Sequence, residues 1–518
     1  MLERNNYLSQ EFGTISDLID INANTNANKL ALIDGERTVS YDQLNKLISK
    51  FANKLITCSI NPQSVIAICA STSIEYVICY LGSLRAGVAV APLAPSSSAD
   101  SIKKMLNNCE ARYVFYDNST FELVSQATQF SQNLVDLDEK KFHDWYSSES
   151  ELFDKIDVKP EWAFNLIYSS GTTGSPKGIV QPHSMRWAHI KRGVDAGYSQ
   201  DSVTVISTPL YSNTTLVSFF PAIALGGTIV LIKKFDALNY LKLAEKYRVT
   251  HSMLVPVQYQ RIMHCEDFNQ FDLSSFQHKF CTSAPFSAEL KRDILARWPG
   301  SLTEYYGMTE GGGTVILKAD QFPDKLHTVG QPASTSDIRL IDDNGNEIKD
   351  IDQTGEIVGN SPAMMTEYHK EPDKTNQAVW FSKDGKRFIR TGDVGKFDSD
   401  GFLVLMDRKK DMIISGGFNI YPSDIESILI QHPDVLEAAV IGVPSTEWGE
   451  TPVAFVILQD ASTNDSVLSK IKTWANDQVG KVQRLSDIKR IDELPRSHIG
   501  KILKKDLRDL WISIERQK

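Results

Sequence analysis

Short apolar segments alternate with helical segments through the first part of the chain, and this alternation restricts the fold more than any other sequence feature. Residues 65–70 are an apolar run suited to a buried strand, residues 74–85 have the length of a helix that Gly87 ends, and residues 88–91 are a second apolar run. Further runs follow at residues 203–206, 229–232 and 251–255. A strand–helix–strand order predicts an α/β fold with parallel-rich sheets covered by helices.

One helix start is marked by side-chain chemistry. Ser40 and Gln43 have the spacing of a capping box, and apolar residues follow at helical spacing from Leu44 to Leu55. The sequence therefore predicts an amphipathic helix there, with its apolar face toward the core.

The pattern changes after about residue 329, where hairpin signals replace the alternation. Asn344-Gly345 and Asp400-Gly401 each lie between apolar strands, and neither segment has the full ligand spacing of a calcium loop. A charged run at residues 407–411 then precedes a new α+β pattern. We expect a large domain over residues 1–409, which ends in a hairpin-rich subdomain, and a small α+β domain over residues 410–518.

Length, charge and cysteine content exclude several classes of protein. The 518 residues exceed what one hydrophobic core organises, so two or more domains are expected. A formal net charge of -10 argues against a nucleic-acid binder, which needs a broad basic face. The six cysteines form no C-x-x-C pair, and the N-terminus lacks the apolar core of a signal peptide. Free thiols in a reducing, cytoplasmic compartment are the simplest interpretation.

An apolar run at residues 216–232 superficially resembles a membrane span. Pro221 and Gly226-Gly227 interrupt the run, and it is short for a bilayer core of about 30 Å. A buried helix, a glycine break and a buried strand fit this segment better, so we expect no membrane span.

The segment YSSGTTGSPKG, at residues 168–178, follows an apolar strand at residues 163–167. Its glycines let the backbone approach an anion, its hydroxyls donate hydrogen bonds, and its lysine adds a positive charge. It is not a Walker A loop, because Pro176 and Gly178 replace the second glycine and the Ser/Thr of that motif. We expect a phosphate-binding loop rather than a flexible surface turn. Its candidate ATP-binding residues are Ser169, Ser170, Gly171, Thr172, Thr173, Gly174 and Lys177.

This loop resembles the signature of the adenylate-forming superfamily, which comprises acyl-CoA synthetases, adenylation domains and luciferases. Further motifs follow in that family's order, and together they span nearly the whole chain. They are YYGMTEGG at 305–312, RTGDVGKFDSDGF at 390–402, DRKKDMIISGGFNIYPSDIE at 407–426 and LPRSHIGKILKKDLR at 494–508. The resemblance implies an acid–thiol ligase that uses ATP, Mg²⁺ and coenzyme A and rotates a small, mobile C-terminal domain between two half-reactions.

The resemblance also implies an adenosine site. Tyr306 would stack on adenine beside Gly307, and the backbone of Ser283, Ala284 and Pro285 would face the adenine amino group. Asp393 would accept the ribose hydroxyls, and Arg408 would lie near the ribose and phosphate. Taken alone, Asp393 and Arg408 would equally suit a surface ion pair; the motifs around them favour the nucleotide role.

Three residues are implied in the chemistry itself. Thr309 would bond the α-phosphate, Glu310 would hold a Mg²⁺ ion that bridges phosphate oxygens, and Lys501 would reach the α-phosphate and the attacking carboxylate. Such a reaction crowds negative charge, so its catalysis consists of positioning and charge neutralisation.

The second half-reaction would use a different set of residues. Lys410 matches the family's hinge position, and Gly416 and Gly417 would line a narrow tunnel for the pantetheine arm of coenzyme A. Weaker candidates for contacts with coenzyme A, for which surface packing and solvated charge are equally good explanations, are Trp448, Lys481 and Arg484.

The acid substrate is the least determined part. Ser212 stands where many acyl- and aryl-CoA synthetases have a histidine, and Asn213 resembles the asparagine that aryl-acid activators place near the ring. The glycine run at 311–313 predicts a pocket larger than acetate needs. The other residues expected around the acid are Met253, Tyr305, Gly307, Gly312 and Gly313. An aryl or aryl-propenoic acid is the first expectation, and a medium or long fatty acid is the second.

Several functions are compatible with this set of motifs. The first is an ATP-dependent carboxylic acid:CoA ligase. The second is a stand-alone adenylation enzyme that loads an acyl carrier protein, although no carrier segment follows Arg508. A sensor without catalysis and a luciferase-like oxygenase are further alternatives. The expected partners are a small carboxylic acid, ATP and coenzyme A, with an acyl carrier protein or a second copy of the chain as additional ones.

Overall fold

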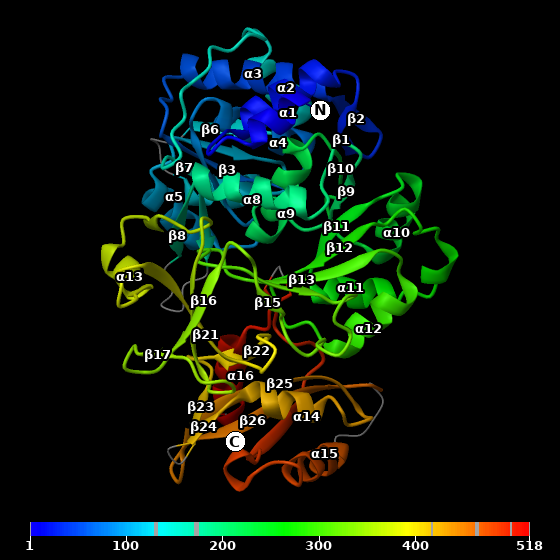
Figure 1. Cartoon of the computed structure of the whole chain (residues 1–518), viewed down its shortest axis with the longest axis vertical. Coiled ribbons are helices and arrows are strands. Elements are labelled where there is room, and N and C mark those ends of the chain that lie inside the picture. The colour runs from blue at the N-terminus through cyan, green and yellow to red at the C-terminus, as the bar shows by residue number, and fades with distance from the viewer. Residues whose placement is uncertain are drawn as a thin grey trace. The chain divides into compact units, whose positions relative to one another are not determined.

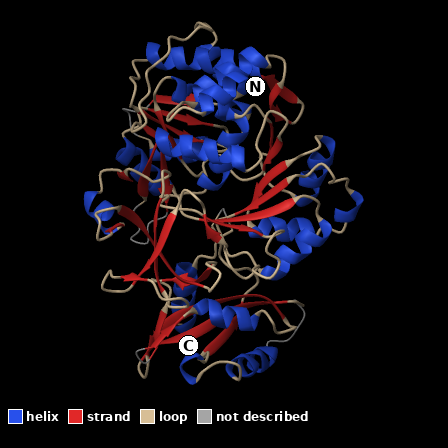
Figure 2. Cartoon of the chain, viewed as in Figure 1, coloured by secondary structure: helices blue, strands red, loops and turns tan. Residues whose placement is uncertain are grey.

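The computed structural model describes residues 2–128, 133–169, 176–415, 418–460, 466–497 and 500–516. Its chain divides into two compact units, each described by itself below (Figures 1 and 2). Unit 1 comprises Met1–His327, Pro332–Asp337 and Gly359–Ile389. Unit 2 comprises Thr328–Gln331, Ile338–Val358 and Arg390–Lys518.

The first sheet of unit 1 has seven strands in the order β19-β8-β7-β4-β3-β5-β6. The five strands from β7 to β6 are parallel, and β8 and β19 extend the sheet as antiparallel strands. The bounds are β3 (Val65–Cys69), β4 (Ala89–Pro92), β5 (Tyr113–Tyr116), β6 (Asn133–Asp136), β7 (Ala163–Ser169), β8 (Lys177–Pro182) and β19 (Glu367–Tyr368). The strands predicted at residues 65–70, 88–91 and 163–167 are therefore confirmed.

A second sheet has nine strands in the order β15-β14-β13-β12-β11-β9-β10-β1-β2. Its strands from β13 to β1 are parallel, whereas β2 and β14 are antiparallel to their neighbours. The bounds are β1 (Leu30–Asp34), β2 (Arg37–Ser40), β9 (Val203–Ile206), β10 (Thr228–Leu231), β11 (His251–Leu254), β12 (His278–Cys281), β13 (Ser301–Tyr306), β14 (Val315–Lys318) and β15 (Gln331–Pro332). The predicted parallel-rich α/β fold is confirmed.

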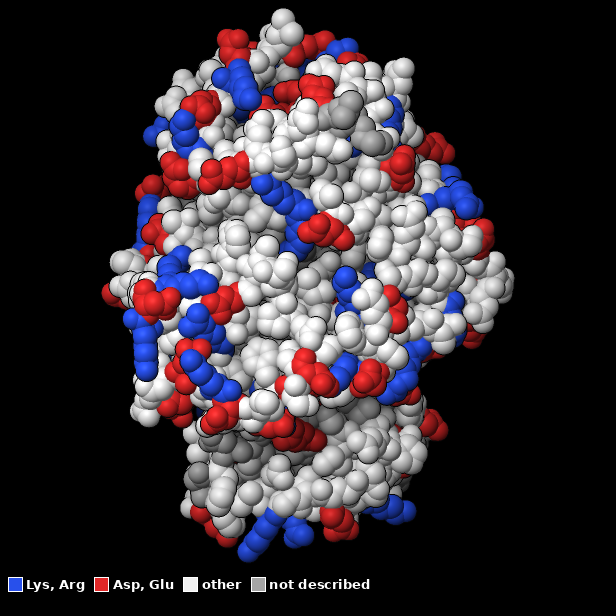
Figure 3. Space-filling model, viewed as in Figure 1, with Lys and Arg blue, Asp and Glu red and all other residues white. Residues whose placement is uncertain are grey.

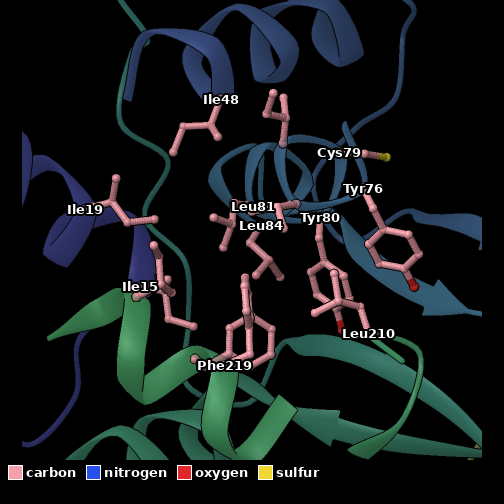
Figure 4. Packing of buried hydrophobic residues seen from close by; sticks show 14 of the residues in the cluster. Ile15, Ile19, Ile48, Tyr76, Cys79, Tyr80, Leu81, Leu84, Leu210 and Phe219 are labelled. Atoms are coloured by element: carbon pink, nitrogen blue, oxygen red, sulfur yellow. The ribbon is translucent and has the colours of Figure 1, made fainter. Parts of the chain in front are cut away.

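Helices pack around these two sheets, and one of them is buried along its whole length. Every residue of α4 (Ile74–Arg85) is buried, and its Tyr80, Leu81 and Leu84 contribute to the core shown in Figure 4. The predicted capping box is present in α3. The other helices of unit 1 are α1 (Leu2–Leu8), α2 (Ile15–Thr25), α3 (Tyr41–Thr57), α5 (Ala99–Cys109), α6 (Phe121–Ala127), α7 (Glu139–Tyr146), α8 (His183–Asp195), α9 (Asn213–Ala224), α10 (Ala237–Lys246), α11 (Pro256–Met263), η1 (Phe268–Gln270), α12 (Ala288–Arg297) and α13 (Pro372–Gln377).

The apolar run at residues 216–232 folds as the sequence predicts. It forms most of α9, a break at Gly226 with φ of 87°, and the buried strand β10. Within the described residues, no helix is long and apolar enough to cross a membrane. All six cysteines are free thiols.

Both predicted hairpins are present. β16 pairs antiparallel with β17, and β21 with β22, and the glycines of the two turns have φ values of 79° (Gly345) and 77° (Gly401), which a residue with a Cβ rarely adopts. The strands of this sheet are β16 (Asp337–Ile341), β17 (Glu347–Ile348), β18 (Gly355–Asn360), β20 (Val379–Phe381), β21 (Arg387–Phe397) and β22 (Leu403–Arg408).

The C-terminal part of unit 2 is an α+β structure with two apolar layers. Ile425 of α14 and Ile471 of α15 pack with Val440 on one side of its sheet, and Leu507 of α16 packs with Phe455 on the other. The elements are β23 (Ile413–Ser415), β24 (Phe418–Ile420), α14 (Pro422–Leu429), β25 (Val435–Ser445), β26 (Gly449–Leu458), α15 (Ser466–Asn476), η2 (Lys481–Gln483), β27 (Asp487–Arg490) and α16 (Lys504–Glu515). The predicted α+β character of this region is confirmed.

Charged side chains of both signs are mixed on the surface. On the face shown in Figure 3, Lys and Arg side chains alternate with Asp and Glu rather than gathering into one patch.

Candidate active site

The carboxyl ends of three parallel strands in unit 1 bring predicted site residues together. β11, β12 and β13 pair in register, with Leu254 beside Cys281 and Cys281 beside Glu304. Met253 therefore lies at the end of β11, Ser283 just after β12, and Tyr305 at the end of β13. Ligands of open α/β sheets bind beyond the carboxyl ends of the strands. The fold thus places acid-pocket and adenine candidates at the expected edge.

The segment after β12 has an unusual backbone conformation. Ser283 has a φ of 83°, which residues with a side chain rarely adopt, and its hydroxyl shares a 2.5 Å hydrogen bond with the hydroxyl of Thr214 on α9. This bond fixes the turn from which Ala284 and Pro285 continue. Strained backbone that is held by a specific contact is typical of ligand sites.

The predicted phosphate loop connects two antiparallel strands. Tyr168 of β7 pairs with Gly178 of β8, and Ser169 pairs with Lys177. The loop therefore closes a hairpin and does not precede a helix. Its predicted members Ser170, Gly171, Thr172, Thr173 and Gly174 lie outside the described residues.

Tyr368 links the end of this loop to the predicted magnesium ligand. Its hydroxyl donates a 2.8 Å hydrogen bond to Oε1 of Glu310, and the Nζ of Lys177 lies 5.1 Å from the centre of its ring. The backbone of Glu310 is also fixed, since its carbonyl accepts a 2.8 Å bond from the Met365 N–H. Tyr368 carries no sequence signal of a site, because it belongs to β19, an edge strand of two residues.

A second group fixes Thr309. Nε2 of Gln181 donates to the Thr309 carbonyl at 2.6 Å and to Oδ1 of Asn213 at 3.2 Å. Arg186, which is buried, donates to the same Asn213 oxygen at 3.0 Å and also bonds to Gln181. Burial lowers the pKa of Arg186 to about 10, so it remains a cation at neutral pH. A positive charge therefore stabilises this side of the site, and no sequence motif marks Gln181 or Arg186.

The glycine run after Glu310 lies against a second backbone segment of unit 1. A Cβ on Gly311 would lie 2.0 Å from the Ala363 carbonyl oxygen, and a Cβ on Gly312 would lie 2.9 Å from the Gly359 oxygen. Both glycines have positive φ, so the close approach of two backbone segments requires them. The assignment of Gly312 to the acid pocket remains a prediction, and a Cβ there would also meet the Ile389 side chain. At Gly307 a Cβ would meet only the Gly313 oxygen, at 3.3 Å.

In unit 2, Asp393 and Arg408 lie opposite each other on β21 and β22 and form a 3.0 Å ion pair. Lys501 lies in the same group. Burial lowers its pKa to about 8, with further contributions from the positive charges of Arg408 and Lys410 and an opposing contribution from Asp393. Four predicted residues from distant parts of the sequence are thus brought together.

Three of the candidates for contacts with coenzyme A lie in the part of unit 2 that follows β25. Trp448 lies in the turn between β25 and β26, and Lys481 and Arg484 are exposed at η2 and just after it. Gly416 and Gly417 lie outside the described residues. The assignments of these five residues to coenzyme A remain predictions.

The lowered pKa of Lys501 gives a testable pH dependence. Its side chain is a cation below pH about 8 and loses that charge as the pH rises through this value. We expect kcat/KM for ATP, which reports the free enzyme, to fall above pH 8, and Lys501→Arg to retain activity to higher pH because arginine stays charged. Initial rates of pyrophosphate release from pH 6 to 10 measure this. An alkaline limb that is the same in both proteins would exclude Lys501 as its source.

The chain is similar to AMP-binding enzymes over most of its length. The family described as AMP-binding enzyme matches residues 19–369, and its C-terminal domain matches residues 424–501. An indoleacetate–CoA ligase of Aromatoleum aromaticum is 30% identical and covers 96% of this chain and 98% of its own. A 4-coumarate–CoA ligase of Narcissus pseudonarcissus is 28% identical, covering 92% and 90%. ATP-bound MatB from Rhodopseudomonas palustris has a TM-score of 0.87 at 27% identity, covering 96% and 99%.

The fold is that of an α/β enzyme whose candidate site residues lie at the carboxyl ends of parallel strands. The chain belongs to the AMP-binding enzyme family. It is an acid–thiol ligase, and adenylate-forming enzymes of this kind use ATP and coenzyme A.

Proposed function

We propose that this protein is an ATP-dependent carboxylic acid:CoA ligase that activates an aryl acid as its acyl-adenylate and transfers the acyl group to coenzyme A. The observation that carries the proposal is the fixed arrangement of Thr309 and Glu310 beside the positive charges of Lys177 and Arg186. This arrangement suits a triphosphate whose α-phosphorus is attacked by a carboxylate.

Adenylation requires neutralisation of growing negative charge. The carboxylate oxygen of the acid bonds to the α-phosphorus while the bond to the β-phosphate breaks and pyrophosphate leaves. Lys177 would offset charge on the phosphates, Thr309 would orient the α-phosphate, and Lys501 would neutralise the attacking and attacked groups. The ion pair of Asp393 and Arg408 would orient the ribose end.

A magnesium ion fits the residues that are present. Glu310 has no cationic partner within the described ranges, and Tyr368 holds one of its oxygens in place. No cluster of three or more potential metal ligands occurs among the described residues, so Mg²⁺ would take its other ligands from phosphate oxygens, as it usually does. When bound, the ion would supply additional charge neutralisation.

Aromatic neighbours support an aryl acid. The rings of Phe280 and Tyr305 lie 5.7 Å apart at the strand ends, close to the buried Met253. Rings and a thioether form favourable contacts with an aromatic substrate. Related proteins are named for 4-coumarate, ferulate and indoleacetate, and one is named for medium- and long-chain fatty acids. A fatty acid is therefore the second candidate.

We further propose that the segments 1–409 and 410–518 act as two domains with Lys410 as the hinge. In this scheme Lys501 serves adenylation, and a rotated arrangement admits the thiol. The sulfur of coenzyme A then bonds to the acyl carbon as AMP leaves.

The products test the activity. With ATP, Mg²⁺ and a panel of aryl and aliphatic acids, we expect pyrophosphate and AMP only when a suitable acid is present, and an acyl-CoA when coenzyme A is added. Chromatography of nucleotides and thioesters measures this, and omission of the acid is the control. ADP as the main product would contradict the proposal.

A further inference from the structure

Arg192 on α8 is an interior cation whose hydrogen-bonding capacity is largely unused. Its Nη1 donates a 2.7 Å hydrogen bond to the hydroxyl of Thr314, and its guanidinium carbon lies 5.7 Å from the centre of the Tyr305 ring. Thr314 directly precedes β14, and Tyr305 is the second-last residue of β13. Arg192 therefore contacts both sides of the turn that carries Thr309 and Glu310.

The other edge of this guanidinium is open. Nε and Nη2 of Arg192 bond to no described residue. Neither nitrogen is fully buried, whereas Nε of Arg186 is buried and has no partner. The side chain is partly exposed, although burial lowers its pKa. Its free edge thus faces a space that solvent reaches, beside the Tyr305 ring.

Two other deep cations of unit 1 have carboxylate partners in the structure, whereas the buried Arg186 and Lys279 bond to neutral groups. Arg85 pairs with Asp20 at 2.7 Å, and Lys291 pairs with Glu304. Among the described residues, no carboxylate forms an ion pair with Arg192. Asp195, one turn away, acts electrostatically on Tyr305 but does not pair with Arg192.

The free edge has the geometry that receives a carboxylate. Nε and Nη2 are the two donors that bind both oxygens of a carboxylate in parallel. Arg390 uses this pair in the same protein, donating to Glu356 at 2.9 Å from Nε and 2.5 Å from Nη2. With Nη1 held by Thr314, the Arg192 guanidinium is oriented in advance for such a partner.

Arg192 lies at a position along α8 that the far end of an acid substrate would reach. Arg186 belongs to the group that fixes Thr309, and Arg192 follows six residues later, about 9 Å along the helix axis. An acid whose reacting carboxylate lies near Thr309 would extend past the Tyr305 ring toward Arg192. An aromatic ring between two carboxylates spans such a separation.

We infer that Arg192 binds a second carboxylate at the far end of the acid substrate, so that the favoured acids are dicarboxylic acids with an aromatic spacer. This inference rests on the proposed function. In it, Arg192 determines which acid is bound and takes no part in the bond-forming steps. A neutral acid leaves the oriented guanidinium without its partner, and the unmet bonds disfavour its binding.

A matched set of three acids tests the inference. We would measure kcat/KM for pyrophosphate release with cinnamic acid, 4-coumaric acid and 4-carboxycinnamic acid, using the full-length wild type, Arg192→Gln and Arg192→Lys. We expect the wild type to prefer 4-carboxycinnamic acid. In Arg192→Gln the ratio of its kcat/KM to that of cinnamic acid should fall by on the order of 10²-fold, as for loss of one partner of a buried charge pair. Arg192→Lys should fall less, because it keeps the charge.

Controls separate the outcomes. Arg297→Gln removes an arginine that pairs with Asp293 at 3.1 Å on α12, and it should leave the ratio unchanged. The inference would be overturned if the wild type preferred cinnamic or 4-coumaric acid. It would also be overturned if Arg192→Gln lowered kcat/KM equally for all acids. If Arg192→Gln does not fold, the acid preference of the wild type and the kcat/KM ratio of Arg192→Lys test the inference instead. Failure of every acid to release pyrophosphate with the wild type would instead overturn the proposed function.

Discussion

Lys501→Ala should slow acid-dependent pyrophosphate release by about 10²-fold or more, the usual scale for loss of a group that stabilises transition-state charge. Lys501 lies with Asp393 and Arg408 in unit 2, and its lowered pKa shows that burial and neighbouring cations act on its ammonium group. The α-phosphate of ATP and the carboxylate of the acid would offset the repulsion between Lys501 and its neighbouring cations, because both groups are negatively charged. The stabilisation therefore grows as the reaction proceeds.

The same variant should leave the second half-reaction nearly unchanged. Thioester formation from synthetic acyl-adenylate and coenzyme A involves no attack on the α-phosphorus, so we expect a change of only a few-fold. Lys505→Ala, which removes an exposed lysine four residues later on α16, is the matched control and should affect neither step. Equal losses in both steps for Lys501→Ala would contradict the proposed alternation of the two domains.

Lys291→Met should lower the free energy of unfolding by about 3–5 kcal/mol, the scale for a buried ion pair that loses one partner. Lys291 is 1% exposed and Glu304 is 6% exposed, and the lysine also donates a 2.8 Å bond to the Leu326 carbonyl. Without the cation, the carboxylate of Glu304 would remain buried and unpaired directly before Tyr305.

The loss should depend on pH. Burial already raises the pKa of Glu304 to about 6, and removal of Lys291 would raise it further. The folded variant then binds a proton that the unfolded chain releases at lower pH, so its stability falls as the pH rises above about 5. Denaturant unfolding at pH 5.5 and 8 measures the effect, and we expect Lys291→Met/Glu304→Gln to recover part of the loss.

The exposed pair of Lys46 and Asp42 provides the control. It lies at 2.9 Å with side chains that are 48% and 43% exposed, so Lys46→Met should leave the free energy of unfolding nearly unchanged. Equal effects of Lys291→Met and Lys46→Met would show that the buried pair does not stabilise the fold.

The sequence by itself determined the elements and the class of protein. Ser40 and Gln43 predicted a helix start, Asn344-Gly345 and Asp400-Gly401 predicted hairpins, and the apolar runs predicted parallel strands, because each depends on interactions between residues close in sequence. The ordered motifs also indicated the adenylate-forming family, since they preserve residues whose chemistry is needed at fixed spacing.

Only the tertiary structure decided which side chains share one site. Tyr368 reaches Glu310 across 58 positions in the sequence, and Gln181 reaches Thr309 across 128, so no local pattern could reveal either contact. Gly312 is a further example, since a Cβ there would meet the distant Gly359 backbone, a constraint that no local sequence pattern reveals. The orientation of Arg192 toward Tyr305 and Thr314 likewise follows from packing of α8 against the ends of β13 and β14, which sequence spacing does not encode.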